Sequence, residues 1–301
     1  MASQPAAQPQ IAGYLAPERR HRLAGLGTFA KARPLGAVCC GLLLIVVVIA
    51  IFAPAIAPYP PNENHLIDGL QSPSSSHLFG TDKFGRDVMS RVVFGARTSI
   101  QVGMLSMLVA VAVSLTLGVT AAYFRGPWDY IVGRVVELAQ ALPGLVLLIT
   151  LLATFGRSVQ SIGIVLGFTT GVISSRVIRG ATLGIAAQQY TEVARSVGCT
   201  STRIILRYLL PNVFPIVIVL ATINVGAAII AEASLSFLGY GVQPPAPSWG
   251  GMLSADGRRY MTTAPWLFYA PTGALAVVVF SINMFGDALR DRLDPRLRGG
   301  K

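Results

Sequence analysis

The chain has 301 residues, of which 53% are hydrophobic and only 12% are charged, and its formal net charge is +11. Soluble domains carry about 25% charged residues, so this composition argues against a soluble domain and indicates a membrane protein. A strongly basic chain is also typical of nucleic-acid-binding proteins, but the placement of the basic residues, described below, argues against that class.

The first 57 residues combine a tail with an apolar run. Residues 1–34 are predicted to form a partly disordered tail, because the first 16 are rich in Ala, Gln and Pro. Residues 35–57 carry no charge and are predicted to form a first transmembrane anchor. The Ala-Ile-Ala sequence at its end resembles a signal-peptide cleavage site. The run is longer than the roughly 7–15 apolar residues of a cleaved signal, which favours an uncleaved anchor.

Six apolar runs predict transmembrane helices, because a helix needs about 20 mostly apolar residues to cross a bilayer. The runs are Leu35–Ala57, Thr98–Phe124, Val135–Thr154, Val159–Ser175, Val213–Ala231 and Leu267–Phe285. Strands of a membrane barrel would show alternating polarity over about ten residues, which these runs do not. The predicted fold class is an all-α membrane protein with six transmembrane helices.

The 24 Lys and Arg residues are distributed unevenly between the two sides that these spans define. With the N-terminus placed inside the cell, most of them fall in the inner segments, as the positive-inside rule requires. The pattern therefore predicts that both termini are cytoplasmic. It also accounts for the basic charge without a nucleic acid.

The sequence lacks the residue patterns of an enzyme. A nucleotide-binding P-loop requires Gly-Lys followed by Ser or Thr, and no lysine here is followed by either. The three histidines form no H-E-x-x-H zinc motif, and we find neither paired acids nor a Ser/His arrangement within the spans. We therefore predict no catalytic residue, no metal site and no cofactor. A membrane-embedded enzyme is the disfavoured alternative.

Three residues within or beside the spans are candidates for a path or a gate. Glu137 lies near the inner end of span three. It is expected either to pair with Arg134 or Arg179, or to line a conduit. Glu232 lies at the outer end of span five, where we expect solvation at the membrane rim. Pro143 interrupts span three, and broken helices in transporters often face a polar cavity.

Residues 192–213 read EVARSVGCTSTRIILRYLLPNV, a polar and basic segment between two apolar runs. Thr191 is expected to cap a short helix beginning near Glu192, with Val193 and Val197 on one face. Gly198 is expected to end that helix, because glycine readily adopts the left-handed conformation.

A second short helix follows the glycine. Thr200 or Ser201 can cap it, and it spans residues 202–210 before Pro211 opens span five. The two helices would form an elbow on the cytoplasmic side. An ordinary amphipathic interfacial loop is the alternative.

The elbow resembles the EAA loop of ABC importer membrane subunits, in which E-A-A is followed by Gly and later by I-x-L-P. Val193 replaces the first Ala of that pattern, and Tyr208 stands where Ile is usual. The residues in register are Glu192, Ala194, Gly198, Leu210 and Pro211.

Three further blocks, residues 77–100, 232–253 and 283–298, resemble the dipeptide/oligopeptide/nickel branch of this family, in its second-permease form. In the first block, Gly-Thr-Asp and Gly-Arg-Asp predict a turn-rich ledge tied by ion pairs such as Asp87–Arg91.

The resemblance implies a type I ABC importer permease fold in a bacterial plasma membrane. It divides the chain into an extracytoplasmic loop at 58–97, a permease core at 98–286 with a cytoplasmic coupling loop at 179–212, and a cytoplasmic tail at 287–301. The implied ATPase-coupling residues are Glu192, Val193, Ala194, Val197, Gly198 and Pro211. The implied partners are a second permease subunit, two ATP-hydrolysing subunits and an extracytoplasmic binding protein.

The implied function is to form half of a path for di- or oligopeptides, while the partner subunits hydrolyse ATP. Nickel complexes, glutathione and haem are alternative cargoes. A non-transporting membrane scaffold is an alternative of a different class.

Overall fold

The computed structural model describes residues 33–293, which contain helices and loops but no β-strand. Residues 1–32 of the predicted disordered tail, and the last eight residues of the predicted C-terminal tail, lie outside the described residues. In chain order the helices are α2 Pro34–Ile51, α3 Ala53–Ile56, η2 Leu66–Asp68, α4 Val88–Phe124, α5 Gly126–Ala141, α6 Gly144–Phe155, α7 Val159–Ala186, α8 Gln189–Ser196, α9 Ser201–Ile204, η3 Ile205–Leu209, α10 Leu210–Phe237, α11 Trp249–Leu253, α12 Ala255–Arg259 and α13 Trp266–Leu293.

Five of these helices are long and apolar enough to cross a membrane, and the bent pair α5–α6 brings the number to six. Five of the six predicted spans are therefore present as single helices, and span three corresponds to the bent pair; several helices are longer than predicted. For example, α4 begins at Val88 rather than Thr98, because Asp87 caps it by accepting a hydrogen bond from the Ser90 amide at 2.7 Å. Hydropathy marks only the part of a helix that matches the hydrocarbon, about 30 Å, whereas the helix itself continues into the polar zone.

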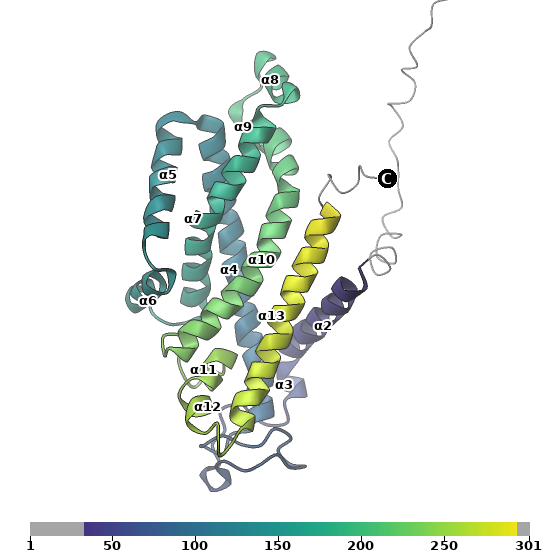
Figure 1. Ribbon diagram of the computed structural model, residues 1–301, viewed down its shortest axis with the longest axis vertical. Helices are drawn as coiled ribbons and strands as arrows, with labels where there is room; N and C mark the ends of the chain where they lie inside the picture. Colours follow the sequence, from purple (N-terminus) through teal and green to yellow (C-terminus); the bar gives the residue numbers. More distant parts are fainter. Residues whose placement is uncertain (1–32, 294–301) are drawn as a thin grey trace, which may run out of the picture.

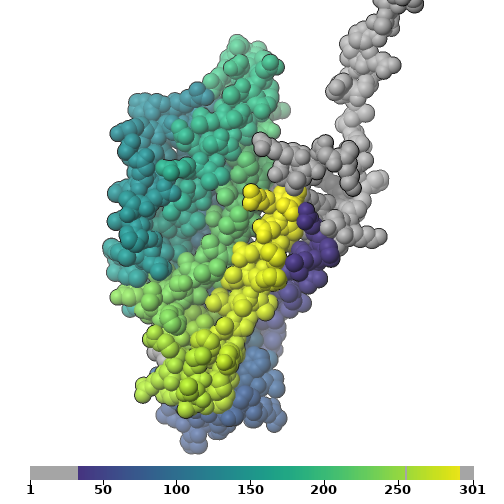
Figure 2. All heavy atoms as spheres, viewed as in Figure 1, coloured from purple at the N-terminus to yellow at the C-terminus, as the bar shows by residue number. Residues whose placement is uncertain are grey.

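The bundle is elongated, and its two ends differ (Figure 1). The short helices α8 and α9 lie at one end, whereas α11, α12 and the loop before α4 lie at the other. The space-filling view in Figure 2 shows α2 and α13 along one edge, with α5 and α6 on the opposite side. Arg33, just before α2, pairs with Asp291 near the end of α13 at 2.9 Å, so the described chain begins and ends on the same side of the bundle.

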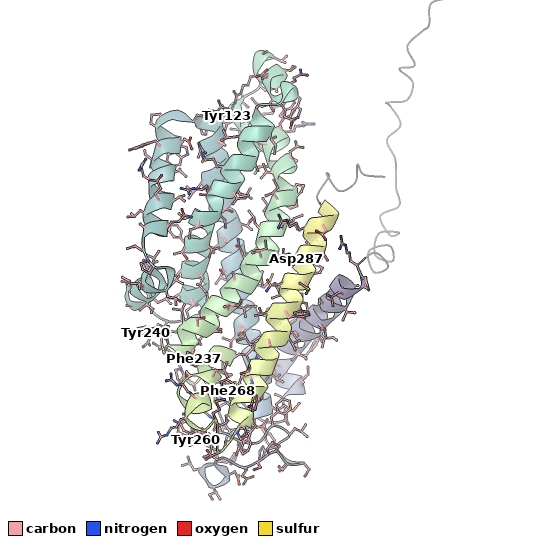
Figure 3. All side chains as sticks on the ribbon, viewed as in Figure 1. Tyr123, Phe237, Tyr240, Tyr260, Phe268 and Asp287 are labelled. Atoms are coloured by element: carbon pink, nitrogen blue, oxygen red, sulfur yellow. The ribbon has the colours of Figure 1, made fainter. Side chains whose placement is uncertain are left out.

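Aromatic side chains lie towards both ends of the bundle (Figure 3). Tyr123 is close to α8 and α9, whereas Phe237, Tyr240, Tyr260 and Phe268 gather at the opposite end. Tyrosine is enriched where a membrane protein meets the two bilayer interfaces, so this distribution fits a bundle that spans the membrane along its long axis.

The contact between α4 and α7 is built on glycines at every fourth position of α7. A Cβ on Gly167 would lie 2.5 Å from the Ser106 carbonyl oxygen, and one on Gly171 would lie 2.9 Å from that of Ala110. Gly163 instead faces the Leu105 side chain, which a Cβ would meet at 2.9 Å. Small residues four apart let two membrane helices approach until their backbones touch. This glycine repeat holds α7 firmly against the longer helix α4.

The predicted interruption at Pro143 is present and is sharper than a kink. Helices α5 and α6 meet at an angle of 99°. Leu142 is extended, with φ −90° and ψ 139°, because a residue that precedes proline is driven out of the helical region. Helix α6 therefore turns away from the direction of α5 (Figure 1).

The ledge before α4 is tied by ion pairs, but by a different aspartate from the one predicted. Arg91 lies 3.7 Å from Asp82, which also binds Arg86 Nε at 2.6 Å. Asp87 instead caps α4 and contacts His77 at 3.1 Å. The predicted Asp87–Arg91 pair is therefore wrong: a cap must accept from the first free amides of its own helix, and this fixes the direction of the Asp87 carboxylate.

Candidate functional site

The elbow predicted at residues 192–213 is present at one end of the bundle. Gly198 ends α8 with φ +79°, a left-handed conformation that favours glycine. Its amide donates to the Arg195 carbonyl at 3.0 Å, and the Cys199 amide donates to the Ala194 carbonyl at 3.0 Å. These two bonds satisfy carbonyls that the end of a helix leaves open. The predicted role of Gly198 in the backbone turn is confirmed.

The start of α8 differs from the prediction. The helix begins at Gln189 after the cap position Gln188, so Thr191 is not a cap. Thr191 is fully buried in the first turn, and its hydroxyl donates to the Ile185 carbonyl at 3.3 Å. Because α7 ends close by, at Ala186, this threonine fastens the elbow to α7.

The side chains of α8 divide between an inner and an outer face. Ala194 is only 5% exposed and packs in a cluster with Ile204 of α9. Val193 and Val197 are 61% and 75% exposed, and Glu192 is exposed beside them. These two valines are not covered by the rest of the described chain, and they form an apolar patch on the tip of the elbow.

The second helix of the elbow continues directly into span five. Thr200 caps it by accepting from the Arg203 amide at 3.4 Å, so of the two predicted caps the structure uses Thr200. Helix α9 passes through one π-helical turn, η3, into α10, and the whole stretch Ser201–Phe237 is one span. Pro211 therefore lies inside a continuous helix rather than opening span five after a break.

The π turn explains why Pro211 is tolerated. The Leu210 amide bonds to the Ile205 carbonyl, five residues back, which widens the helix just before the proline. The side-chain amide of Asn212 donates to the Tyr208 carbonyl at 2.7 Å. A proline removes one backbone donor, and this side chain supplies another to the same turn.

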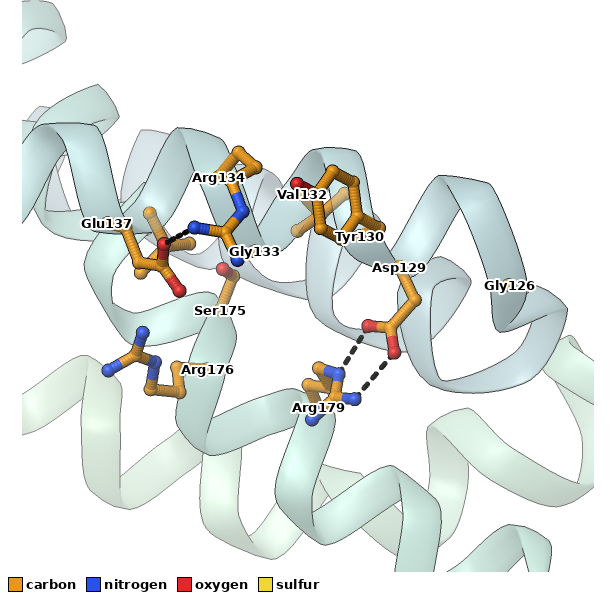
Figure 4. A pocket seen from close by; sticks show the side chains of 11 residues that line it. Gly126, Asp129, Tyr130, Val132, Gly133, Arg134, Glu137, Ser175, Arg176 and Arg179 are labelled. Atoms are coloured by element: carbon orange, nitrogen blue, oxygen red, sulfur yellow. Dashed lines mark hydrogen bonds and ion pairs between the residues drawn. The ribbon is translucent and has the colours of Figure 1, made fainter.

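Glu137 forms one of the two pairs predicted for it. Arg134 Nη1 lies 2.6 Å from Glu137 Oε2, whereas Arg179 binds Asp129 of α5 through both of its carboxylate oxygens (Figure 4). The sequence reading did not single out Asp129. The sequence signal for Asp129 was its place in the first turn of α5, where a negative charge suits the helix dipole. Both pairs border a pocket of about 360 Å³ between α5 and α7.

The expectation for Glu232 is wrong. Its side chain is 0% exposed rather than solvated at the rim. Its Oε1 accepts from the Ser236 hydroxyl at 2.7 Å, and the Ser248 hydroxyl donates to Ser236 at 3.4 Å. Ser248 caps α11, which folds back over α10 so closely that a Cβ on Gly250 would meet the Ala233 backbone at 2.5 Å. Helix α11 covers the position that hydropathy places at the surface.

Comparisons with known proteins agree with this architecture. Residues 114–299 match the family described as binding-protein-dependent transport system inner membrane component. Residues 31–73 match the N-terminal TM domain of oligopeptide transport permease C. The chain belongs to the ABC importer permeases of the DppC/OppC type.

Two relatives show how far the similarity extends. The dipeptide transport system permease protein DppC of Alkalihalophilus pseudofirmus is 39% identical over 261 residues, which cover 86% of this chain and 85% of the relative. The glutathione transport system permease protein GsiD of Escherichia coli is 38% identical over 258 residues, which cover 85% of each chain. This permease is therefore a multi-pass membrane component of an ABC importer, a class that works with ATPase and substrate-binding partners.

The fold of this permease is also found among solved structures. It superimposes on a chain of the MetNI methionine ABC transporter, in a structure of inward-facing conformations, with a TM-score of 0.55 and 19% identity. The match covers 68% of this chain and 97% of the MetNI chain. It supports the type I importer permease fold.

Of the predicted site residues, the structure brings the coupling candidates together but leaves the path candidates apart. The coupling candidates share the elbow or the helix that follows it: Glu192, Val193, Ala194, Val197, Gly198 and Pro211. The three path candidates are separate from them and from one another. Glu137 borders the α5–α7 pocket, Pro143 lies at the α5–α6 break and Glu232 is buried beneath α11.

Proposed function

We propose that this permease forms half of the translocation path of an ATP-driven importer for di- or oligopeptides. In this proposal it receives its mechanical drive through the elbow of α8 and α9 from separate ATPase subunits. The other half of the path comes from a second, homologous permease. An extracytoplasmic binding protein delivers the substrate.

The observation that carries this proposal is the elbow itself. It is a compact knob with an exposed apolar tip at Val193 and Val197, and a glycine turn fixes its shape. It continues without a break into α10, so a force applied to the knob acts directly on a membrane helix. An amphipathic interfacial loop would bury its apolar residues in the membrane surface and would need no such continuity.

The orientation follows from the same proposal. The elbow and both ends of the described chain lie in the cytoplasm, and the ledge before α4 and α11 face the outside of a bacterial plasma membrane. The positive-inside distribution of Lys and Arg supports this assignment. The pairing of Arg33 with Asp291 supports an even number of crossings between them.

Peptides are the cargo that the relatives favour. One relative is named as a dipeptide permease and the other as a glutathione permease, and both names refer to compounds with peptide bonds and free carboxylates. We infer that this chain handles short peptides of that chemistry, with glutathione as the second candidate.

The test is reconstitution of the complete importer in lipid vesicles. Val197→Asp should lower the amount of ATPase that copurifies with the membrane subunits by about tenfold, because it places a charge in an apolar contact. Ile67→Asp is the matched control, since Ile67 is a 98% exposed apolar residue in the loop at the opposite end. Unchanged ATPase binding and peptide uptake in Val197→Asp would contradict the proposal.

A further inference from the structure

The pocket between α5 and α7 brings charged side chains together in the elbow-side half of α7. Asp129, Arg134 and Glu137 come from α5, and Arg176 and Arg179 come from α7 (Figure 4). Helix α7 is about 42 Å long, and Arg176 lies roughly 15 Å from its elbow end. Arg176 directly follows the apolar run Val159–Ser175, so it lies at the elbow-side border of the hydrocarbon, which is about 30 Å thick.

Charged side chains are costly where they face lipid, so those of this pocket are expected to face protein or water. Among residues 33–293 two ion pairs account for four of the five charges. Asp129 binds Arg179, and Glu137 binds Arg134. Arg176 is exposed, and within residues 33–293 it has no carboxylate within 4.0 Å and no hydrogen-bond partner. The pocket thus presents one guanidinium in surplus.

The volume of the pocket suits a small ligand. Its volume of about 360 Å³ falls in the range of roughly 300–1,000 Å³ typical of small-molecule sites. Figure 4 shows Arg176 and Glu137 extending from opposite helices at its border. Because Glu137 is already paired with Arg134, the unpaired group is the Arg176 guanidinium, which matches a carboxylate.

We propose that this pocket is a subsite of the translocation path that holds the C-terminal carboxylate of a peptide through Arg176. This inference depends on the proposed function and adds a substrate requirement to it: the cargo carries a free carboxylate. A guanidinium is suited to this task, because its planar fork donates two parallel hydrogen bonds to a carboxylate. Glu137 keeps its pair with Arg134 at the border of the pocket.

A direct binding assay tests the subsite without transport. Gly133 borders the pocket, and a Cβ there meets no atom within 4 Å, so Gly133→Cys places a thiol in open space. The complete importer carrying this variant, with the three native cysteines replaced, is alkylated in nanodiscs of neutral lipid. A free-acid dipeptide should slow the alkylation, and the same dipeptide with a C-terminal amide should not. Addition of Arg176→Gln should abolish the slowing.

Uptake into vesicles provides the second measurement. Arg176→Gln should lower the ratio of free-acid to amide uptake by about tenfold, the usual effect of losing a charge-assisted hydrogen bond. Arg176→Lys should retain part of the ratio. The binding protein is the same in every sample, so its own preference cancels between variants. Arg97→Gln, an exposed arginine on α4 outside the pocket, should leave the ratio unchanged.

The outcomes separate this inference from the proposed function. If peptide uptake works but Arg176→Gln keeps the wild-type ratio and the wild-type protection, the subsite is refuted and the importer function stands. Protection by anionic lipid in place of the dipeptide would assign Arg176 to a lipid headgroup and refute the subsite. Loss of the second permease from Arg176→Gln complexes would assign it to a subunit contact and also refute it.

Discussion

Replacing Gly198 by valine should weaken the attachment of the ATPase subunits while leaving the membrane body intact. Gly198 has φ +79°, and a Cβ at this position meets no atom within 4 Å. The substitution is therefore not opposed by a clash, and its cost is conformational. A left-handed backbone costs an ordinary residue roughly 1–2 kcal/mol, which corresponds to a factor of about 5–30 in an equilibrium.

Valine relieves this strain by opening the turn, and an open turn moves α8 relative to α9. If only the closed elbow docks, the apparent affinity for the ATPase subunits falls by up to about 5–30-fold. The measurement is a titration of purified ATPase subunits into permease complexes in nanodiscs, with peptide-stimulated ATP hydrolysis as the readout. Membrane insertion and yield should match the wild type.

Asparagine is the matched control, because it also adds a side chain but tolerates the left-handed region. Gly198→Asn should retain affinity within about threefold of the wild type. Equal affinity for valine and wild type would refute the view that the closed turn is required. An equal loss for valine and asparagine would show that a contact at this surface, rather than backbone strain, sets the affinity.

Three further predictions concern packing, burial and orientation. Gly167→Leu should destabilise the permease by about 3 kcal/mol or prevent folding, because a Cβ at this position meets the backbone of α4. Gly184→Leu on the same helix is the control, because a Cβ there meets no atom within 4 Å and the variant should fold. Thermal unfolding in detergent measures the difference between the two variants. Glu232→Ala should lower the stability by about 2–3 kcal/mol in the same assay, because it leaves a cavity and the Ser236 hydroxyl without its acceptor. Glu232→Gln keeps the shape and the acceptor, so it should lower the stability by less than about 1 kcal/mol. In a variant without native cysteines, an impermeant maleimide added to intact spheroplasts should label Ile67→Cys but not Val197→Cys; the reverse pattern would invert the proposed orientation.

The sequence predicts those features that depend on neighbouring residues. Runs of apolar residues locate the spans, Pro143 locates the break in span three, and Gly198 locates the turn of the elbow. In each case the physical cause lies within a few positions: hydrocarbon length, a missing backbone donor, or a residue without a Cβ. The cap at Thr200 belongs to the same class.

The features that sequence reasoning misses depend on distant partners. The burial of Glu232 requires α11 to fold back over α10, and no pattern near residue 232 reveals that cover. The choice of Asp129 by Arg179 depends on how α5 packs against α7. Thr191 is a residue type that often caps helices, but its hydroxyl donates to the Ile185 carbonyl at the end of α7 instead. The close approach of α4 and α7 was readable in principle, from glycines four residues apart.

The continuity of α9, η3 and α10 makes span five a lever. The helix from Ser201 to Phe237 is a rod of roughly 55 Å, with the elbow at one end and the buried Glu232 near the other. If the rod pivots at the elbow, a tilt of about 5° displaces its far end by about 5 Å. Because Ser236 and Ser248 tie α11 to this rod, the proposed drive predicts that a push on the elbow at one face of the membrane moves α11 at the other.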